Sequence, residues 1–285
     1  MPTRWFSETL HQHVRQTLAV RRTIARQRTA FQQMQVLETA AYGRALVLDD
    51  IVQTTEGDEF IYHEMMTHLP LMAHPNPRQV LVIGGGDGGI AREVLRHRSV
   101  ERVVMVEIDP DVMQACRRYL PKICGGAFGD SRLEVVVDDG AKYVRETSER
   151  FDVAIVDSPD PVGPATVLFV TEFYRNVARV LRGPGMMVCQ TGSTFLQPRE
   201  IGEAFRRLRL VFARVMPYVA AIPTYIGGFF GFLLASNRVQ PLRVAPAVLE
   251  ARYRRARLAC RYYTPAIHQA CFALPANVRA LLGPI

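Results

Sequence analysis

The chain has 285 residues, 48% of them hydrophobic and 22% charged, which is the composition of a globular protein with one large domain and one small one. No apolar run approaches the ~18 residues of a membrane helix, and the N-terminus lacks the apolar core of a secretory signal, so we expect a cytoplasmic protein without a membrane segment. Five cysteines, an odd number without CxxC spacing, favour reduced thiols in that compartment.

The net charge of +8 raises the possibility of nucleic-acid binding. The arginines, however, are scattered near both ends of the chain, and no basic run alternates with aromatic residues as a single-strand groove requires. We therefore favour a solvated basic surface over a nucleic-acid footprint.

Residues 1–55 have the pattern of a small antiparallel β domain. Gln33–Leu37 and Ala45–Leu48 have strand-like composition, and Tyr42–Gly43 is a turn between them. No glycine-rich loop occurs in this segment. We expect the remaining residues, 56–285, to form the catalytic domain.

A helix is expected over Asp58–His74, because its apolar residues recur at helical spacing. Pro70 should kink this helix or end its regular part. His63 and His68 resemble a zinc-protease motif, but they are five residues apart rather than four and share a helix face poorly, so we expect no metal. Tyr62 and His63 have either a functional role or an ordinary packing role on this helix.

The next segment has the order strand, glycine loop, helix. Val80–Ile83 is followed by the run Gly84–Gly89 and then by helical spacing, which is typical of the nucleotide-binding start of a Rossmann-like unit. A second strand, Val103–Val106, leads to Glu107, about 20 residues past the glycine loop, where such folds place an acid on the ribose hydroxyls. Glu107 is otherwise a helix-capping acid, but Asp109 fills that position better.

Strands and helices alternate from here to about residue 220, which predicts a doubly wound α/β sheet. The expected strands are Leu133–Val137, Val153–Val156, Met187–Gln190 and Ala213–Val219, and the glycine-containing run Ile226–Ala235 also has strand character. The last segment, rich in Arg, Tyr and Pro, is expected to be a helical and irregular cap.

Two of these strands end in carboxylates. Asp139 follows one of them, where Rossmann-like methyltransferases place an acid on the adenine amino group, although it is equally well placed to cap the next helix. Asp157 and Asp160 follow another, on a loop stiffened by prolines. Ligands bind beyond the carboxyl ends of such strands, so this loop is either a site for an amine or cation or an ordinary turn.

Taken together, these motifs resemble the spermidine synthase family over almost the whole chain and in the same order. The matching segments are Leu48–Glu56, Asp58–Glu64, Val80–Gly89, Val106–Asp109, Val137–Gly140, Asp157–Pro164, Ala221–Tyr225 and Cys260–His268. The resemblance implies a Rossmann-like, methyltransferase-type doubly wound sheet with a small N-terminal antiparallel β domain. It also implies a homodimer or homotetramer that works without metal or other cofactor.

The activity implied by the resemblance is aminopropyl transfer from decarboxylated S-adenosylmethionine to putrescine, which gives spermidine and methylthioadenosine. Asp157 would be the base, assisted by Tyr62, because an alkyl amine arrives protonated and must lose a proton before it attacks. Asp87 would bind the amino end of the aminopropyl group. The other residues implied are, around the nucleoside, Gln32, Gln53, Glu107, Asp139, Gly140 and Pro164, and, around the polyamine, His63, Asp160 and Tyr225.

Two positions depart from the family pattern. Gly57 stands where the family often has Arg, and Thr166 stands where it tends to have Glu. Neither carries proposed chemistry, but they leave cadaverine, agmatine or spermidine open as the acceptor. The alternatives to aminopropyl transfer are an S-adenosylmethionine-dependent methyltransferase and a non-catalytic nucleoside- or polyamine-binding protein.

Overall fold

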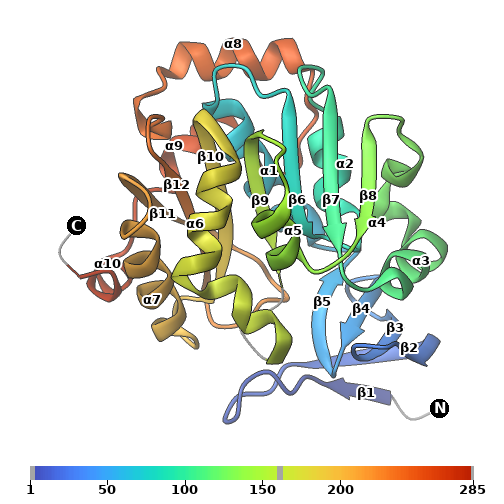
Figure 1. The fold of residues 1–285 in the computed structure, drawn as a ribbon. Coiled ribbons are helices and arrows are strands. Elements are labelled where there is room, and N and C mark those ends of the chain that lie inside the picture. Colours follow the sequence, from blue (N-terminus) through green and yellow to red (C-terminus); the bar gives the residue numbers. More distant parts are fainter. Residues whose placement is uncertain (1–3, 159–162, 284–285) are drawn as a thin grey trace.

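The computed structural model describes residues 4–158 and 163–283 and contains two β-sheets. The small first sheet lies beneath the carboxyl ends of the strands of a larger central sheet (Figure 1). No helix in these described ranges is long and apolar enough to cross a membrane. The site lies between the two sheets, so their junction is the part of the fold that matters most for function.

The first sheet is antiparallel and has the strand order β1-β2-β3-β4-β5. Its hairpin between β3 and β4 includes Gly43, at a positive φ of 69°. This positive φ favours glycine at the turn, and the side chain of Glu56 packs where a Cβ on Gly43 would lie. The strands are β1 (Arg4–Ser7), β2 (Thr17–Arg28), β3 (Gln33–Thr39), β4 (Arg44–Leu48) and β5 (Ile51–Thr55).

The central sheet has seven strands in the order β11-β12-β10-β9-β6-β7-β8. The strands are parallel except for β12, which pairs antiparallel with both of its neighbours. They are β6 (Gln79–Gly84), β7 (Arg102–Glu107), β8 (Leu133–Val137), β9 (Phe151–Asp157), β10 (Leu181–Ser193), β11 (Arg214–Ala221) and β12 (Phe229–Ser236). This is the α/β sheet expected from the sequence.

Helices cover both faces of the central sheet, because successive residues of its apolar strands point to opposite sides. Val80 and Val82 pack with α1, α2 and α8, whereas Leu81 and Ile83 pack with α5, α6, α7 and α10. The helices are α1 (Glu59–Ala73), α2 (Gly89–Leu95), α3 (Pro110–Tyr119), α4 (Pro121–Cys124), α5 (Gly140–Glu146), α6 (Thr171–Val180), α7 (Pro198–Arg209), α8 (Pro246–Ala256), α9 (Pro265–Ala270) and α10 (Ala276–Leu281). The short 3-10 helices are η1 (Ala127–Gly129), η2 (Gly163–Phe169) and η3 (Pro241–Arg243).

A separate apolar core joins the first sheet to the central one. Met34, Val36 and Leu46 of the first sheet pack against Val112 and Cys116 of α3. All five of these side chains are buried. This shared core places the first sheet against α3, which follows β7.

Most of the expected elements are present, and two need comment. The helix expected over 58–74 is α1, but it continues through Pro70 to Ala73, so the proline does not end it. The strand expected from Ile226 starts only at Phe229, because Gly227 and Gly228 adopt positive φ values of 101° and 88° and turn the chain first. The C-terminal cap is helical, as expected.

Candidate active site

A cleft of about 380 Å³ opens where the strand order of the central sheet reverses. From β6 the chain proceeds to β7 and β8 on one side, whereas β9 and β10 lie on the other. Ligands of open α/β sheets bind at this switch point, beyond the carboxyl ends of the strands. The register pairs Gly84 of β6 with Asp157 of β9, so the glycine loop and the acidic loop begin side by side.

Ten of the twelve site residues expected from the sequence line this cleft. They are Gln32, Gln53, Tyr62, His63, Asp87, Glu107, Asp139, Gly140, Asp157 and Tyr225. Asp160 lies outside the described residues. Pro164 falls within η2, but its side chain also lies outside the described part of the chain.

Asp157 lies next to Tyr62 in the lining of the cleft. The Tyr62 hydroxyl donates a hydrogen bond of 2.6 Å to Asp157 Oδ1. Burial, reinforced by the charge of Asp87, raises the pKa of the Asp157 carboxyl to about 6, against the opposing effect of His63 and the Tyr62 hydrogen bond. Burial also raises the pKa of Tyr62 well above its usual range, so this residue remains a donor. A carboxylate with a pKa near neutrality can exchange a proton at physiological pH.

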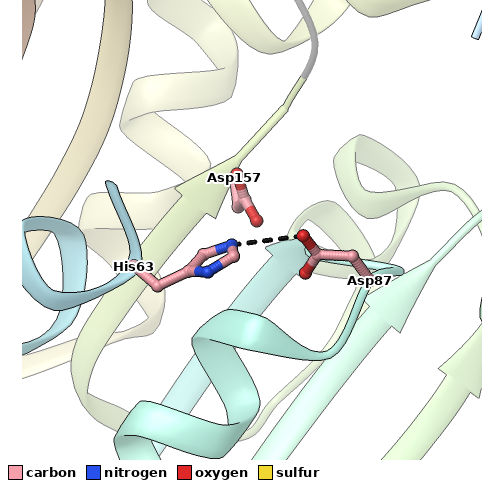
Figure 2. Close-up of side chains that lie close together, drawn as sticks. All are labelled: His63, Asp87 and Asp157. Atoms are coloured by element: carbon pink, nitrogen blue, oxygen red, sulfur yellow. Dashed lines mark ion pairs between the residues drawn. The ribbon is translucent and has the colours of Figure 1, made fainter. Parts of the chain in front are cut away.

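Asp87, on the glycine loop, forms an ion pair with His63 of α1. His63 Nε2 lies 3.2 Å from Asp87 Oδ2, and the Gly89 amide donates to Asp87 Oδ1 at 2.8 Å. Figure 2 shows the two side chains converging from different elements, with Asp157 facing both from the end of β9. Burial acts to raise the pKa of Asp87, but the charge of His63 and these hydrogen bonds outweigh it, so the pKa is lowered.

The two neighbouring carboxylates of the cleft therefore differ in character. Asp87 is held ionised, whereas Asp157 has a raised pKa and readily takes up a proton. Such a divergence between paired acids is typical of sites that assign one acid to charge and the other to proton transfer.

His63, Asp87 and Asp157 also bring one oxygen or nitrogen each to within 4.8 Å of one another, close enough for a cation. The His63 nitrogen of this group already faces the carboxylate of Asp87, so the arrangement is satisfied as an ion pair. That no metal takes part stays a prediction.

Glu107 and Gln32 lie on the β7 side of the cleft. Burial raises the pKa of Glu107 to about 7. A Cβ on Gly86 would lie 2.9 Å from Glu107 Oε2, so glycine at this position gives the acid its space. Asp109 caps α3, as expected, and its Oδ2 accepts a 2.9 Å hydrogen bond from Gln32 Nε2 of the first sheet.

Asp139 caps α5 by accepting hydrogen bonds from the amides of Ala141 and Lys142 through Oδ1. The capping role considered for this residue is therefore confirmed, and Asp139 also lines the cleft. A Cβ on the neighbouring Gly140 would lie 2.3 Å from the side chain of Ile83, which explains the glycine by packing alone.

Tyr225 lies on the loop between β11 and β12, on the other side of the cleft. Its hydroxyl donates to the carbonyl of Gln53, and its ring packs edge-on against Tyr62 at 5.8 Å between centroids. The buried carboxylate of Asp58 holds this loop by accepting from the amide and hydroxyl of Thr224 at 2.8 and 2.7 Å. Asp58 thus joins the start of α1 to the Tyr225 loop.

Several residues that line the cleft or contact its lining were not identified from the sequence. Glu8, on the segment after β1, is 4% exposed and lines the cleft, and Gln190 of β10 donates to the Ser158 carbonyl at 3.0 Å. Glu59 of α1 forms a pair with His63 at 2.5 Å. Glu8 and Glu59 do not follow a predicted strand, and Gln190, the last residue of the predicted strand Met187–Gln190, is not an acid. Only the spacing of Glu59 and His63, four residues apart, is a signal that they share a helix face.

The open sheet with acidic loops at its switch point defines an enzyme of the methyltransferase-like α/β class. The spermine/spermidine synthase domain model matches residues 59–243, and the spermidine synthase tetramerisation domain model matches residues 4–56. A polyamine aminopropyltransferase from Ruegeria sp. (strain TM1040) is 48% identical and covers 97% of this chain and 98% of its own length. One from Erwinia tasmaniensis is 49% identical and covers 95% of both. The chain belongs to the spermine/spermidine synthase family.

Solved structures agree with this assignment. The crystal structure of a spermidine synthase in complex with the transition-state analogue AdoDATO is 37% identical, with a TM-score of 0.94, over 99% of this chain and 97% of that one. The spermidine synthase from Thermotoga maritima is 36% identical, with a TM-score of 0.92, over 100% and 96%. The protein is thus an enzyme of the aminopropyltransferase class.

Proposed function

We propose that the protein transfers the aminopropyl group of decarboxylated S-adenosylmethionine to putrescine. The single observation that carries this proposal is the pairing of two buried acids of unlike character, Asp157 with a pKa of about 6 and the ionised Asp87, at the floor of a nucleoside-sized cleft. A base and a cation anchor side by side are what the attack of one amine on a second, cationic substrate needs.

The donor would occupy the side of the cleft between the glycine loop and β8. Its ribose hydroxyls would donate to Glu107 and its adenine would lie near Asp139, while its primary ammonium would pair with Asp87. An ionised acid at this position favours the decarboxylated donor, because ordinary S-adenosylmethionine would bring a carboxylate close to Asp87 at a cost of roughly 1 kcal/mol or more.

The acceptor would enter on the side of Tyr62 and Tyr225. The ammonium group of putrescine loses one proton to Asp157, and the freed lone pair attacks the aminopropyl methylene carbon that is bonded to the sulfonium sulfur. The carbon–sulfur bond breaks, and sulfur keeps the electron pair as the neutral thioether methylthioadenosine. The product amine is a secondary ammonium, and the proton on Asp157 is released to solvent, so the charge balances.

The remaining parts of the proposal concern assembly and surroundings. We expect a homodimer or homotetramer, an expectation supported by the match of residues 4–56 to a domain model described as a tetramerisation domain. We also expect a cytoplasmic enzyme that needs no metal, and full activity in the presence of a chelator would agree with this.

The test is the release of methylthioadenosine from each sulfonium donor over a panel of amines. We expect release from the decarboxylated donor with putrescine, and comparison with cadaverine, agmatine and spermidine fixes the acceptor. Methyl transfer from S-adenosylmethionine without aminopropyl transfer would refute the proposal. The variant Asp157→Asn, nearly the same size as wild type, should lose turnover by at least about 100-fold while retaining methylthioadenosine binding.

A further inference from the structure

His63 is clamped between two carboxylates. The ring is 2% exposed, Nδ1 lies 2.5 Å from Glu59 Oε2, and Nε2 lies 3.2 Å from Asp87 Oδ2. A Cβ on Gly89 would lie 2.2 Å from His63 Cε1, so the last glycine of the glycine loop admits this ring. The ring therefore has little freedom to turn away from either acid.

Both contacts require a hydrogen on the ring nitrogen. An ionised carboxylate only accepts hydrogen bonds, and a neutral imidazole carries a single N–H, so one neutral nitrogen would point its lone pair at a carboxylate. Only the doubly protonated ring satisfies both acids. In agreement, the charges of Asp87 and Glu59 outweigh burial and raise the pKa of His63 to about 10.

Glu59 is itself held in place by Arg92 of α2. The guanidinium grips both carboxylate oxygens, at 2.8 and 3.1 Å, and Arg92 Nη1 also donates to the carbonyl of Ile123 at 2.6 Å. Bidentate pairs of this kind fix the orientation of the carboxylate as well as its charge. Burial opposes ionisation of Glu59, yet His63 and Arg92 together lower its pKa.

This clamp bears on the difference between Asp87 and Asp157. Two carboxylates that share a buried site tend to share one proton, because both cannot ionise without cost. The cation of His63 beside Asp87 removes that symmetry and directs the proton toward Asp157. The titratable groups around the His63–Asp87 ion pair are Glu59 and Tyr62 from α1, Arg92 from α2, Cys116 from α3 and Asp157 from β9.

We propose that Glu59, fixed by Arg92, is a positioning residue that acts through His63: it keeps the His63 ring doubly protonated and aimed at Asp87, and so holds Asp87 ionised for the ammonium group of the donor. Glu59 itself does not contact the substrate. The part that concerns the donor rests on the proposed function, whereas the state of His63 in the free protein does not.

The first experiment reads the ring of His63 directly in the ligand-free protein. Long-range ¹H–¹⁵N spectra distinguish an imidazolium from either neutral tautomer, and loss of one signal set in His63→Gln assigns this residue among the seven histidines. We expect an imidazolium at pH 7.5 in the wild type and a neutral ring in Glu59→Gln, whose amide can donate to Nδ1. A neutral wild-type ring, or an unchanged imidazolium in the variant, would overturn the proposal.

The matched control is Glu93→Gln. Glu93 accepts from Nε of the same Arg92 at 2.8 Å and is likewise buried, but its other partners are His68 and Arg96 rather than His63. This variant should lose stability and keep His63 as an imidazolium. Conversion of His63 to a neutral ring in this control would assign the effect to the whole buried network and count against Glu59.

The second experiment is a kinetic double-mutant cycle. In Glu59→Gln and in His63→Gln we expect the KM for the donor to rise roughly tenfold with kcat changed less, and the rise should steepen below pH 7 as Asp87 takes up a proton. The double variant should resemble His63→Gln alone, because Glu59 acts through the ring. Additive losses would show an independent structural role and refute the proposal. A failure to turn over this donor in the wild type would refute the proposed function and leave the spectroscopic result standing.

Discussion

Removing the Tyr62 hydroxyl should make the carboxyl of Asp157, the proposed general base, harder to ionise. In Tyr62→Phe the 2.6 Å hydrogen bond to Asp157 Oδ1 is lost, while the ring and its packing remain. A hydrogen bond to a charged group contributes about 1.5–3 kcal/mol, and one pKa unit corresponds to about 1.36 kcal/mol. The pKa of Asp157, about 6 in the intact site, should therefore rise by about 1–2.

The consequence is a shift of the acidic limb of the pH profile. Because Asp157 must be ionised to accept a proton, activity falls as the pH drops through its pKa, and a higher pKa moves that limb to higher pH. For kcat/KM of the amine at saturating donor, Tyr62→Phe should lose roughly two- to tenfold at pH 7 and recover most of the loss by pH 9.

A matched control separates this effect from repacking. Tyr218 belongs to the same aromatic cluster, stacks on Phe232 at 4.9 Å between centroids, and donates its hydroxyl to the Met65 carbonyl instead. Tyr218→Phe should leave the limb in place. An acidic limb at the same pH in Tyr62→Phe and wild type, or a loss of equal size at every pH, would refute this account of Tyr62.

Three further predictions concern stability. Gly84→Ala places a Cβ 2.0 Å from the Asp157 carbonyl oxygen, at a φ of +81°, and should lower the free energy of unfolding by roughly 3 kcal/mol or more. The control Gly126→Ala, at a φ of +82° in open space, should lower it by about 1 kcal/mol. Equal losses of stability in thermal melts of the two variants would contradict the clash at Gly84. The carboxylate of Glu64 accepts hydrogen bonds from the backbone amides of residues 261–263. In Glu64→Gln at least one of these amides loses its acceptor, so their hydrogen exchange should become faster while α10 stays protected. His63 has a pKa of about 10 in the fold against 6.5 in the unfolded chain, so the stability from its charge is fully present below pH 6.5 and is lost as the pH rises through 10. Denaturant titrations should therefore show that the loss of stability in His63→Gln becomes smaller over that range. A loss of stability that does not vary with pH would contradict a charged His63.

Much of the fold could be predicted because its signals are local. The apolar run of Val80–Ile83, the glycines after it and the carboxylate at Glu107 lie within one strand–loop–helix unit, where sequence order and spatial order coincide. The place of β12 could not be predicted. It enters between β10 and β11 and runs antiparallel to both, and its apolar composition suits any buried strand of the sheet.

The sequence by itself determined which residues could carry the chemistry, since parallel strands bring the acids that follow them to one edge of the sheet, and Asp87, Glu107, Asp139 and Asp157 all line the cleft. Only the tertiary structure decided how these acids differ. The pKa of a carboxylate depends on its burial and on the distance to other charges, and both quantities are set by residues far away in the chain. Asp157 gains a hydrogen bond from Tyr62, 95 positions earlier, and Glu59 is gripped by Arg92, 33 positions later. For this reason packing makes Asp87 the ionised anchor and Asp157 the proposed base, whereas the order of residues alone does not assign these two roles.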